Sequence, residues 1–264
     1  MQRLLIVPIV VGLALCMHIT GCAGLSSTPS ESPPVENPDP LEKINRPMDK
    51  MNNFLDRHIG KPVADGYVTV VHPDIRLSVS NFFDNLGYLN VILHDFLQGK
   101  GKQGFQDSSR FLVNTTIGIG GLFDVATGMG LEEHNEDFGQ TLGTWGADEG
   151  AYLVLPVFGP DTVRNVPDIV TSAVTNIFFY VTTPIIAPLA VLKFVDRRAR
   201  ADQAIRFRDE SAVEPYLFTR EAYLQHRTFL VYDGNPPTEE LFLDEIYVED
   251  GNPESASTSI DGQK

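Results

Sequence analysis

The sequence predicts a mainly α-helical protein that is exported and held at a membrane by its N-terminus. Three observations predict this. An apolar run behind Arg3 ends in a cysteine, apolar residues then recur at helical spacing, and two long stretches carry almost no charge. With 264 residues, 42% hydrophobic and 21% charged, the chain is long enough for one sizeable domain.

Residues 1–21 have the pattern of a bacterial lipoprotein signal peptide. Arg3 precedes an apolar run over residues 4–17, which is too short to span a bilayer comfortably. The run leads into I-T-G-C at 19–22, which is typical of a lipobox, so Cys22 is the predicted lipid attachment site. Removal of residues 1–21 also removes Cys16, which leaves no thiol for a disulfide, a metal or catalysis.

Two segments outside the body are predicted to lack a fold. Residues 22–38 are rich in serine and proline and are predicted to form a flexible tether. Residues 233–264 hold nine acids and one base, so we expect a disordered acidic tail that supplies more than half of the net charge of −15. This acidity disfavours a nucleic-acid partner, since phosphate binding needs a basic surface. The folded domain is then expected over residues 39–232.

The first two helices of the body follow from capping signals and periodicity. Asp39 suits an N-cap and Glu42 the matching position of a capping box, ahead of apolar residues spaced three and four apart up to residue 55. Pro47 is expected to kink or restart this helix. A second helix is predicted from about residue 73 to a glycine at 99, with a break near residues 85–87.

Residues 169–192 carry no charge and are followed by a basic cluster. Their prolines and hydroxyl side chains argue against a straight membrane span, and two helices broken near residues 183–184 fit better. Two interpretations stay open at this point: helices lying in or against a membrane, and helices buried in a core. In the membrane interpretation, the candidate membrane-facing residues are Ile177, Phe178, Phe179 and Tyr180.

Several motifs in one order resemble the MlaA/VacJ family of outer-membrane lipoproteins, from residue 39 to about residue 232. They are D-P-L-E-x-x-N-R at 39–46, F-L-Q-G at 96–99, R-F-x-x-N-T-x-x-G-x-G-G-x-x-D-x-A at 110–126, F-G-x-T-L-G at 138–143 and R-E-A-Y at 220–223. The resemblance implies in-plane helices that form a ring around an amphipathic channel, in the inner leaflet of the outer membrane. It also implies removal of misplaced phospholipids from the outer leaflet, with a trimeric porin and a soluble periplasmic lipid carrier as partners.

Glycines follow one another through the later part of the body. Glycine permits both bends and close approach of chain segments, so we expect a mobile segment over residues 139–159. The candidate hinge or loop glycines are Gly139, Gly143, Gly146, Gly150 and Gly159.

Catalytic and metal sites are not predicted. The chain has no G-x-S-x-G and no H-E-x-x-H, and Phe123 stands where a dinucleotide fingerprint needs glycine. The segment E-E-H-N-E-D at 132–137 could ligate calcium or magnesium, but one histidine among acids in a loop is more typical of a solvated turn. We therefore expect no enzyme activity, no cofactor and no metal.

Three functional hypotheses remain at this stage. The favoured one is a protein that moves phospholipids, and the alternatives are a porin-associated structural lipoprotein and a phospholipase. The transport hypothesis requires a polar-lined opening, whereas the scaffold hypothesis expects a tightly packed interior. The phospholipase would need a nucleophile and a base within hydrogen-bond reach.

Overall fold

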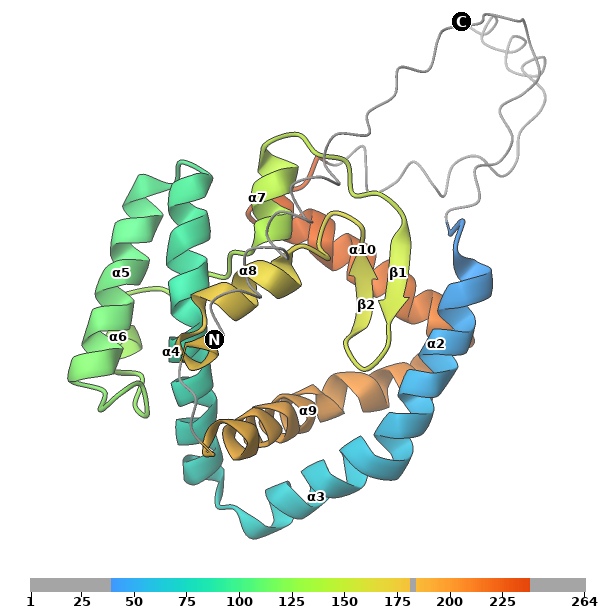
Figure 1. The fold of residues 1–264 in the computed structure, drawn as a ribbon, viewed down its shortest axis with the longest axis horizontal. Helices are drawn as coiled ribbons and strands as arrows, with labels where there is room; N and C mark the ends of the chain where they lie inside the picture. Colours follow the sequence, from blue (N-terminus) through green and yellow to red (C-terminus); the bar gives the residue numbers. More distant parts are fainter. Residues whose placement is uncertain (1–38, 181–183, 238–264) are drawn as a thin grey trace, which may run out of the picture. The chain divides into compact units, whose positions relative to one another are not determined.

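The computed structural model describes residues 39–180 and 184–237, which form a helical body with a β-hairpin (Figure 1). Cys22, the tether and nearly all of the acidic tail lie outside the described residues. The elements in chain order are α2 (Glu42–Leu55), η3 (Asp56–Gly60), α3 (Lys61–Val70), α4 (Pro73–Leu97), α5 (Gly101–Thr116), α6 (Val125–Gly128), α7 (Phe138–Thr144), β1 (Tyr152–Leu155), β2 (Gly159–Thr162), α8 (Asp168–Thr175), η4 (Ile177–Phe179), α9 (Ile186–Ser211) and α10 (Pro215–Val231).

Long helices make the frame of the body. The helices α2, η3 and α3 follow one another without an intervening turn, and η3 has π-helical hydrogen bonding. The long helix α9 packs along α3 and also contacts α4 and α10 (Figure 1). On the other side of α4, α5 packs antiparallel to it. The helix α9 therefore joins segments that are far apart in the sequence.

The antiparallel hairpin β1–β2 is attached to α2 by two asparagine side chains. The Asn45 amide donates to the Tyr152 carbonyl at 2.9 Å, and its oxygen accepts from the Val154 N–H at 2.9 Å. Two helical turns further along α2, Asn52 donates to the Leu155 carbonyl at 2.9 Å. These amides satisfy backbone groups that a neighbouring strand would otherwise pair. A hairpin this short is marginal alone, so α2 holds it in place.

Burial in this protein is inverted relative to an ordinary globular domain. Among the described residues, polar and charged side chains outnumber apolar ones in the interior, whereas many large apolar side chains are exposed. The most deeply buried large side chains are His94, Gln140, Asn45, Thr141, Thr162, Asp39, Asp95, Asp107 and Asp196. The interior is therefore held by hydrogen bonds and ion pairs, and the outer surface supplies the apolar area.

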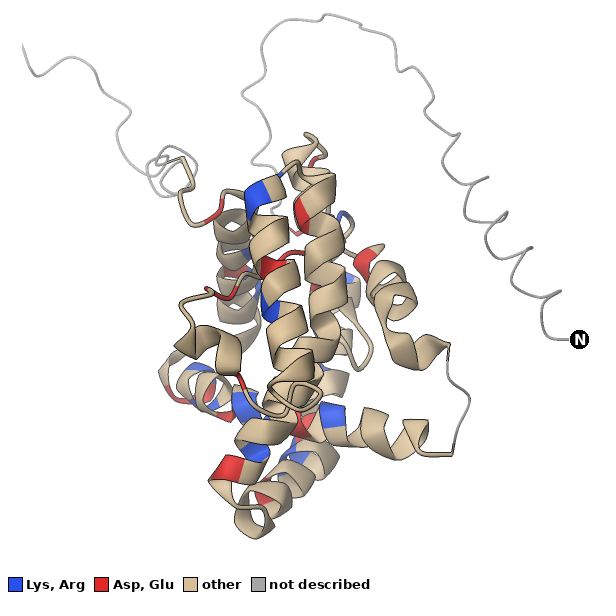
Figure 2. Cartoon of the chain, turned by 90° about the vertical axis from the view of Figure 1, so that its left-hand side faces the viewer, with Lys and Arg blue, Asp and Glu red and all other residues tan. Residues whose placement is uncertain are grey.

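The exposed apolar residues lie on several elements, including α3, the ends of α4, α5, the hairpin turn, and α8 with η4. Figure 2 shows acidic and basic residues at a few positions along α4 and α5, between uncharged ones. No helix in the described ranges is both long and apolar enough to span a bilayer. Exposed apolar side chains in this number are typical of a surface that contacts a membrane or a partner.

Two helix boundaries differ from the sequence expectation. The predicted break near residues 85–87 is wrong, because α4 is continuous. Asn85 faces inward and donates to the Thr115 hydroxyl of α5 at 3.0 Å, so this polar residue packs between helices. The predicted capping box is also wrong: Glu42 accepts from Arg46 at 2.6 Å, although Asp39 does accept from the Leu41 N–H at 3.1 Å.

The uncharged stretch 169–192 forms two helices with a break between them, as the sequence predicts. The first is α8, followed by the short η4, and the second is the start of α9. The alternative that these helices are buried in a core is wrong, since α8 and η4 contain no buried residue. The sequence could not decide this, because an apolar helix face packs equally well against protein or hydrocarbon.

Candidate functional site

A cavity of about 530 Å³ lies between α2, η3, the hairpin, α9 and α10. Its size falls within the range of about 300–1,000 Å³ that is usual for small-molecule sites. Its lining is mixed in character. The apolar lining residues are Leu55, Ile59, Val154, Val157, Phe158, Pro160, Phe194, Ala201 and Ile205, and the polar or charged ones include Asp49, Asn52, Asn53, Asp56, Arg197, Arg198, Arg208 and Thr219.

One face of α9 supplies both kinds of lining. Phe194, Arg198, Ala201, Ile205 and Arg208 recur at steps of three and four, so they lie in a row along the helix. Apolar and cationic side chains therefore alternate along one wall. Such a wall suits a ligand with apolar and anionic parts.

The hairpin turn contributes the most exposed apolar side chains of the cavity. Val157 and Phe158 are 60% and 71% exposed. Val157 has φ = +70°, a conformation that is unusual for a β-branched residue, and its N–H donates to the Asn52 side chain at 2.8 Å. The α2 asparagine therefore determines where this turn lies at the cavity.

Arg198 on α9 forms an ion pair with η3 and so connects two walls of the cavity. Its guanidinium forms a two-pronged ion pair with Asp56, with the Nη2–Oδ2 bond at 2.9 Å, and also binds Asp202 at 3.1 Å. Hydrogen bonding to Asp56 raises the pKa of Arg198 above its usual value. The neighbouring Arg197 also lines the cavity, is exposed, and forms no ion pair within the described residues. One cation is thus structural, and the other is available to a ligand.

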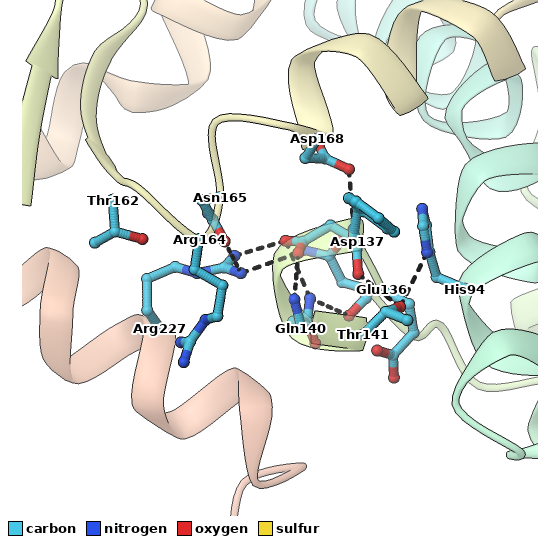
Figure 3. A network of polar contacts seen from close by, with 12 residues as sticks. His94, Glu136, Asp137, Gln140, Thr141, Thr162, Arg164, Asn165, Asp168 and Arg227 are labelled. Atoms are coloured by element: carbon cyan, nitrogen blue, oxygen red, sulfur yellow. Dashed lines mark hydrogen bonds and ion pairs between the residues drawn. The ribbon is translucent and has the colours of Figure 1, made fainter. Parts of the chain in front are cut away.

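A second feature is a polar network around α7, which joins α4, α8 and α10 (Figure 3). The Arg227 guanidinium binds both carboxylate oxygens of Asp137, at 2.6 and 2.9 Å, and donates to Asn165 at 2.5 Å. Burial would raise the pKa of Asp137, but the hydrogen bonds and charge of Arg227 hold this pKa below its usual value. Asp137 also caps α7 by accepting from the Gln140 N–H at 2.8 Å.

The network continues toward α4 through neutral groups. His94 is fully buried, its Nδ1 lies 3.0 Å from the Thr141 hydroxyl, and burial lowers its pKa. Nearby, Lys100 donates to Glu136 at 2.8 Å. A buried network that is this extensively hydrogen-bonded holds its elements rigidly. Of the helices that the network joins, α10 also lines the cavity.

In the segment 132–137, a candidate cation loop in the sequence, three side chains are bound to protein groups. Glu136 is bound by Lys100, Asp137 by Arg227, and the His134 Nδ1 lies 3.1 Å from Asp107. Within the described residues, no group of three or more histidine, cysteine or acidic side chains is placed to hold a metal ion.

The predicted membrane-facing residues lie on an exposed surface. Ile177, Phe179 and Tyr180 are 50%, 58% and 67% exposed. Phe178 is half-buried, and its ring lies 6.4 Å from that of Phe82 on α4. Their contact with a membrane stays a prediction.

The predicted hinge glycines have two different surroundings. Gly139 and Gly143 lie within α7, where a Cβ at Gly139 would come 1.6 Å from the Asn165 side-chain oxygen. Gly146, Gly150 and Gly159 have positive φ, and Gly159 lines the cavity. Mobility of the segment 139–159 stays a prediction.

Sequence reasoning did not identify the cavity residues. One signal was present: Asn45, Asp49, Asn52 and Asp56 recur at steps of four and three, so α2 and η3 carry a polar stripe. This stripe faces the hairpin and α9. Its partners could not be identified from local spacing.

The sequence profile of the MlaA lipoprotein family matches residues 37–230. The chain belongs to this family. The match covers the described body almost completely, and it contains every motif on which the resemblance was based. The assignment agrees with the mainly helical fold.

Relatives of known name support the assignment. The intermembrane phospholipid transport system lipoprotein MlaA of Haemophilus influenzae is 33% identical over 86% of this chain and 91% of its own length. The protein of the same name from Escherichia coli K12 is 34% identical over 82% of this chain and 85% of its own length. A solved structure described as the structural basis for maintenance of bacterial outer membrane lipid asymmetry has a TM-score of 0.65 and 32% identity, covering 73% of this chain and 98% of that one.

Proposed function

We propose that this MlaA-family protein transports phospholipids, taking misplaced molecules from the outer leaflet of the outer membrane toward a soluble periplasmic carrier. The observation that carries the proposal is the amphipathic cavity of about 530 Å³ between α2, the hairpin and α9. A phospholipid has acyl chains and a charged headgroup. The mixed lining of this cavity can contact both.

The inverted burial supports the same function. Exposed apolar side chains on α3, α5, α8 and η4 suit a body partly immersed in hydrocarbon. Transferring a two-chain lipid into water would cost on the order of 20–25 kcal/mol, at about 0.8 kcal/mol for each of roughly thirty CH₂ groups. A path with apolar and polar walls avoids most of that cost, and it needs no covalent chemistry. We therefore propose a transporter without enzyme activity.

The location follows from the predicted lipobox and the family. We propose that acylated Cys22 holds the protein at the periplasmic side of the outer membrane, and that a trimeric porin is its partner there. Ile177, Phe179 and Tyr180, which are exposed on or next to η4, are then in contact with the inner leaflet. The soluble carrier receives the lipid from the cavity.

Transport can be tested with a substitution that fills the cavity. Ala201 lies on the cavity face of α9, whereas Ala204 is exposed on the same helix and does not line the cavity. A strain lacking the gene should accumulate phospholipid on the cell surface, as measured by labelling of outer-leaflet phosphatidylethanolamine. Ala204→Trp should restore the asymmetry, and Ala201→Trp should not, at equal protein levels in the outer membrane.

The same pair of variants separates transport from the structural alternative. If the protein were a porin-associated lipoprotein without transport activity, both variants should complement the deletion equally, because neither substitution removes one of the exposed large apolar side chains that a porin could contact. Equal restoration would therefore reject the proposed transport through this cavity. Absence of surface phospholipid in the deletion strain would reject the transport function altogether.

A further inference from the structure

A smaller cavity of about 350 Å³ adjoins the amphipathic cavity, between α2, η3, the end of α9 and the start of α10. The two cavities share Asp49, Asn53 and Arg208 in their linings. Arg208 therefore lies where the one cavity meets the other. We call the smaller one the basic cavity because of its charges.

The basic cavity is lined by four arginine or lysine side chains and three carboxylates, although the chain as a whole has a net charge of −15. Two of the cations have internal partners: Arg46 binds Glu42 and Glu214, and Arg208 binds Asp209 and Asn53. The other two, Lys50 and Arg57, form no hydrogen bond or ion pair with another described residue.

Both of these unpaired cations face the same space. Lys50 and Arg57 are seven residues apart along α2 and η3, so they lie on the same helical face two turns apart. The Phe54 and His58 rings line the same cavity, with 4.1 Å between their centroids. The cavity thus combines two available cations with an aromatic pair.

We propose that the basic cavity binds the phosphate group of a glycerophospholipid whose acyl chains occupy the amphipathic cavity. This inference rests on the proposed transport function and names the part of the protein that recognises the polar end of the substrate. The phosphodiester carries one negative charge and two free oxygens. Arginine can bind two such oxygens in parallel, and lysine adds a point charge.

The continuity of the two cavities identifies the ligand. A free phosphate would use only the cations, and a neutral lipid would use only the apolar walls. A phospholipid uses both, with its glycerol near Arg208 and Asn53 at the junction. Recognition through the phosphate selects phospholipids as a class, because the phosphate is common to all headgroups.

The test compares two lipids with the same acyl chains, one of which carries a phosphoglycerol headgroup where the other has a free hydroxyl. Full-length acylated protein in non-ionic detergent is titrated with phosphatidylglycerol and with diacylglycerol, each carrying the same fluorescent acyl chain. Lys50→Gln/Arg57→Gln should weaken phosphatidylglycerol binding about tenfold and leave diacylglycerol binding unchanged. The control Lys43→Gln/Arg206→Gln removes two exposed cations from outside both cavities and should change neither.

Other outcomes separate this inference from the proposed function. Equal weakening for both lipids, or no weakening in the cavity variant, would overturn phosphate recognition but would not contradict the proposed lipid transport. If the cavity bound inorganic phosphate and the acyl chains made no difference to binding, the cavity would be a site for free anions. This result would also overturn the inference. If the wild-type protein bound neither lipid, both the inference and the proposed transport would fail.

Discussion

Gly139 has the least space for a side chain among the glycines of the α7 network. Its substitution therefore tests how much this network contributes to stability. A Cβ at this position would lie 1.6 Å from the Asn165 oxygen and 2.6 Å from its side-chain carbon. Asn165 cannot move away freely, because it accepts from Arg227 at 2.5 Å and donates to the Tyr223 hydroxyl at 3.0 Å. Gly139→Ala therefore forces these two hydrogen bonds to break.

The magnitude follows from those two bonds. The bond to the charged Arg227 contributes about 1.5–3 kcal/mol and the bond to Tyr223 about 0.5–1.5 kcal/mol. The higher helix propensity of alanine returns up to about 1 kcal/mol. We therefore expect Gly139→Ala to lower the free energy of unfolding by about 1–3.5 kcal/mol.

The assay can follow α7 directly. Trp145 is the single tryptophan of the chain and caps the C-terminus of α7, so its fluorescence reports on this helix during urea unfolding in detergent. The matched control is Gly87→Ala in the middle of α4, where a Cβ meets no atom within 4 Å. This control should be stabilised by about 0.5–1 kcal/mol. If both variants unfolded within 0.5 kcal/mol of the wild type, the packing argument would be refuted.

Three further predictions concern charge and the membrane. Arg227→Met leaves the buried Asp137 carboxylate without its cation, so urea unfolding at pH 7 should show a loss of about 3–5 kcal/mol, and a neutral result would contradict the network. Burial and the neighbouring Asp107 raise the pKa of Asp95 to about 8. The folded state thus keeps a proton that the unfolded state loses above about pH 4, and stability falls by up to about 1.4 kcal/mol per pH unit between pH 4 and 8. Unfolding at pH 5 and pH 8 should show a smaller loss in Asp95→Asn; an unchanged slope would reject this. A polarity-sensitive label on Phe179→Cys should be quenched by bilayer-embedded spin labels, whereas the same label on Gln203→Cys should not.

Much of the helical pattern could be predicted from the sequence. The apolar spacing after Asp39, the glycine at 99 and the prolines near residue 184 lie close to helix boundaries in the structure. The hairpin at 152–162 was missed, because strands of four residues give little periodic signal and are stabilised here by Asn45 and Asn52 from α2. Short strands need a partner that local sequence does not identify.

The candidate site was less accessible to sequence reasoning. The amphipathic cavity combines residues from 49–60, 152–160 and 194–219, which the packing of α9 against α3 and α10 brings together. The pairing of Arg198 with Asp56 spans 142 residues. Local spacing identified a polar stripe on α2 but could not supply its partners.

The sequence by itself determined the helical character of the body and the order of motifs that places the chain in its family, and it predicts an exported and anchored N-terminus. These properties depend on neighbouring residues, so they are visible in one dimension. Only the tertiary structure decided that polar groups lie inside and apolar faces outside. The physical reason is that an amphipathic helix has the same periodicity whether its apolar face meets protein or lipid, and long-range contacts alone determine which face is covered.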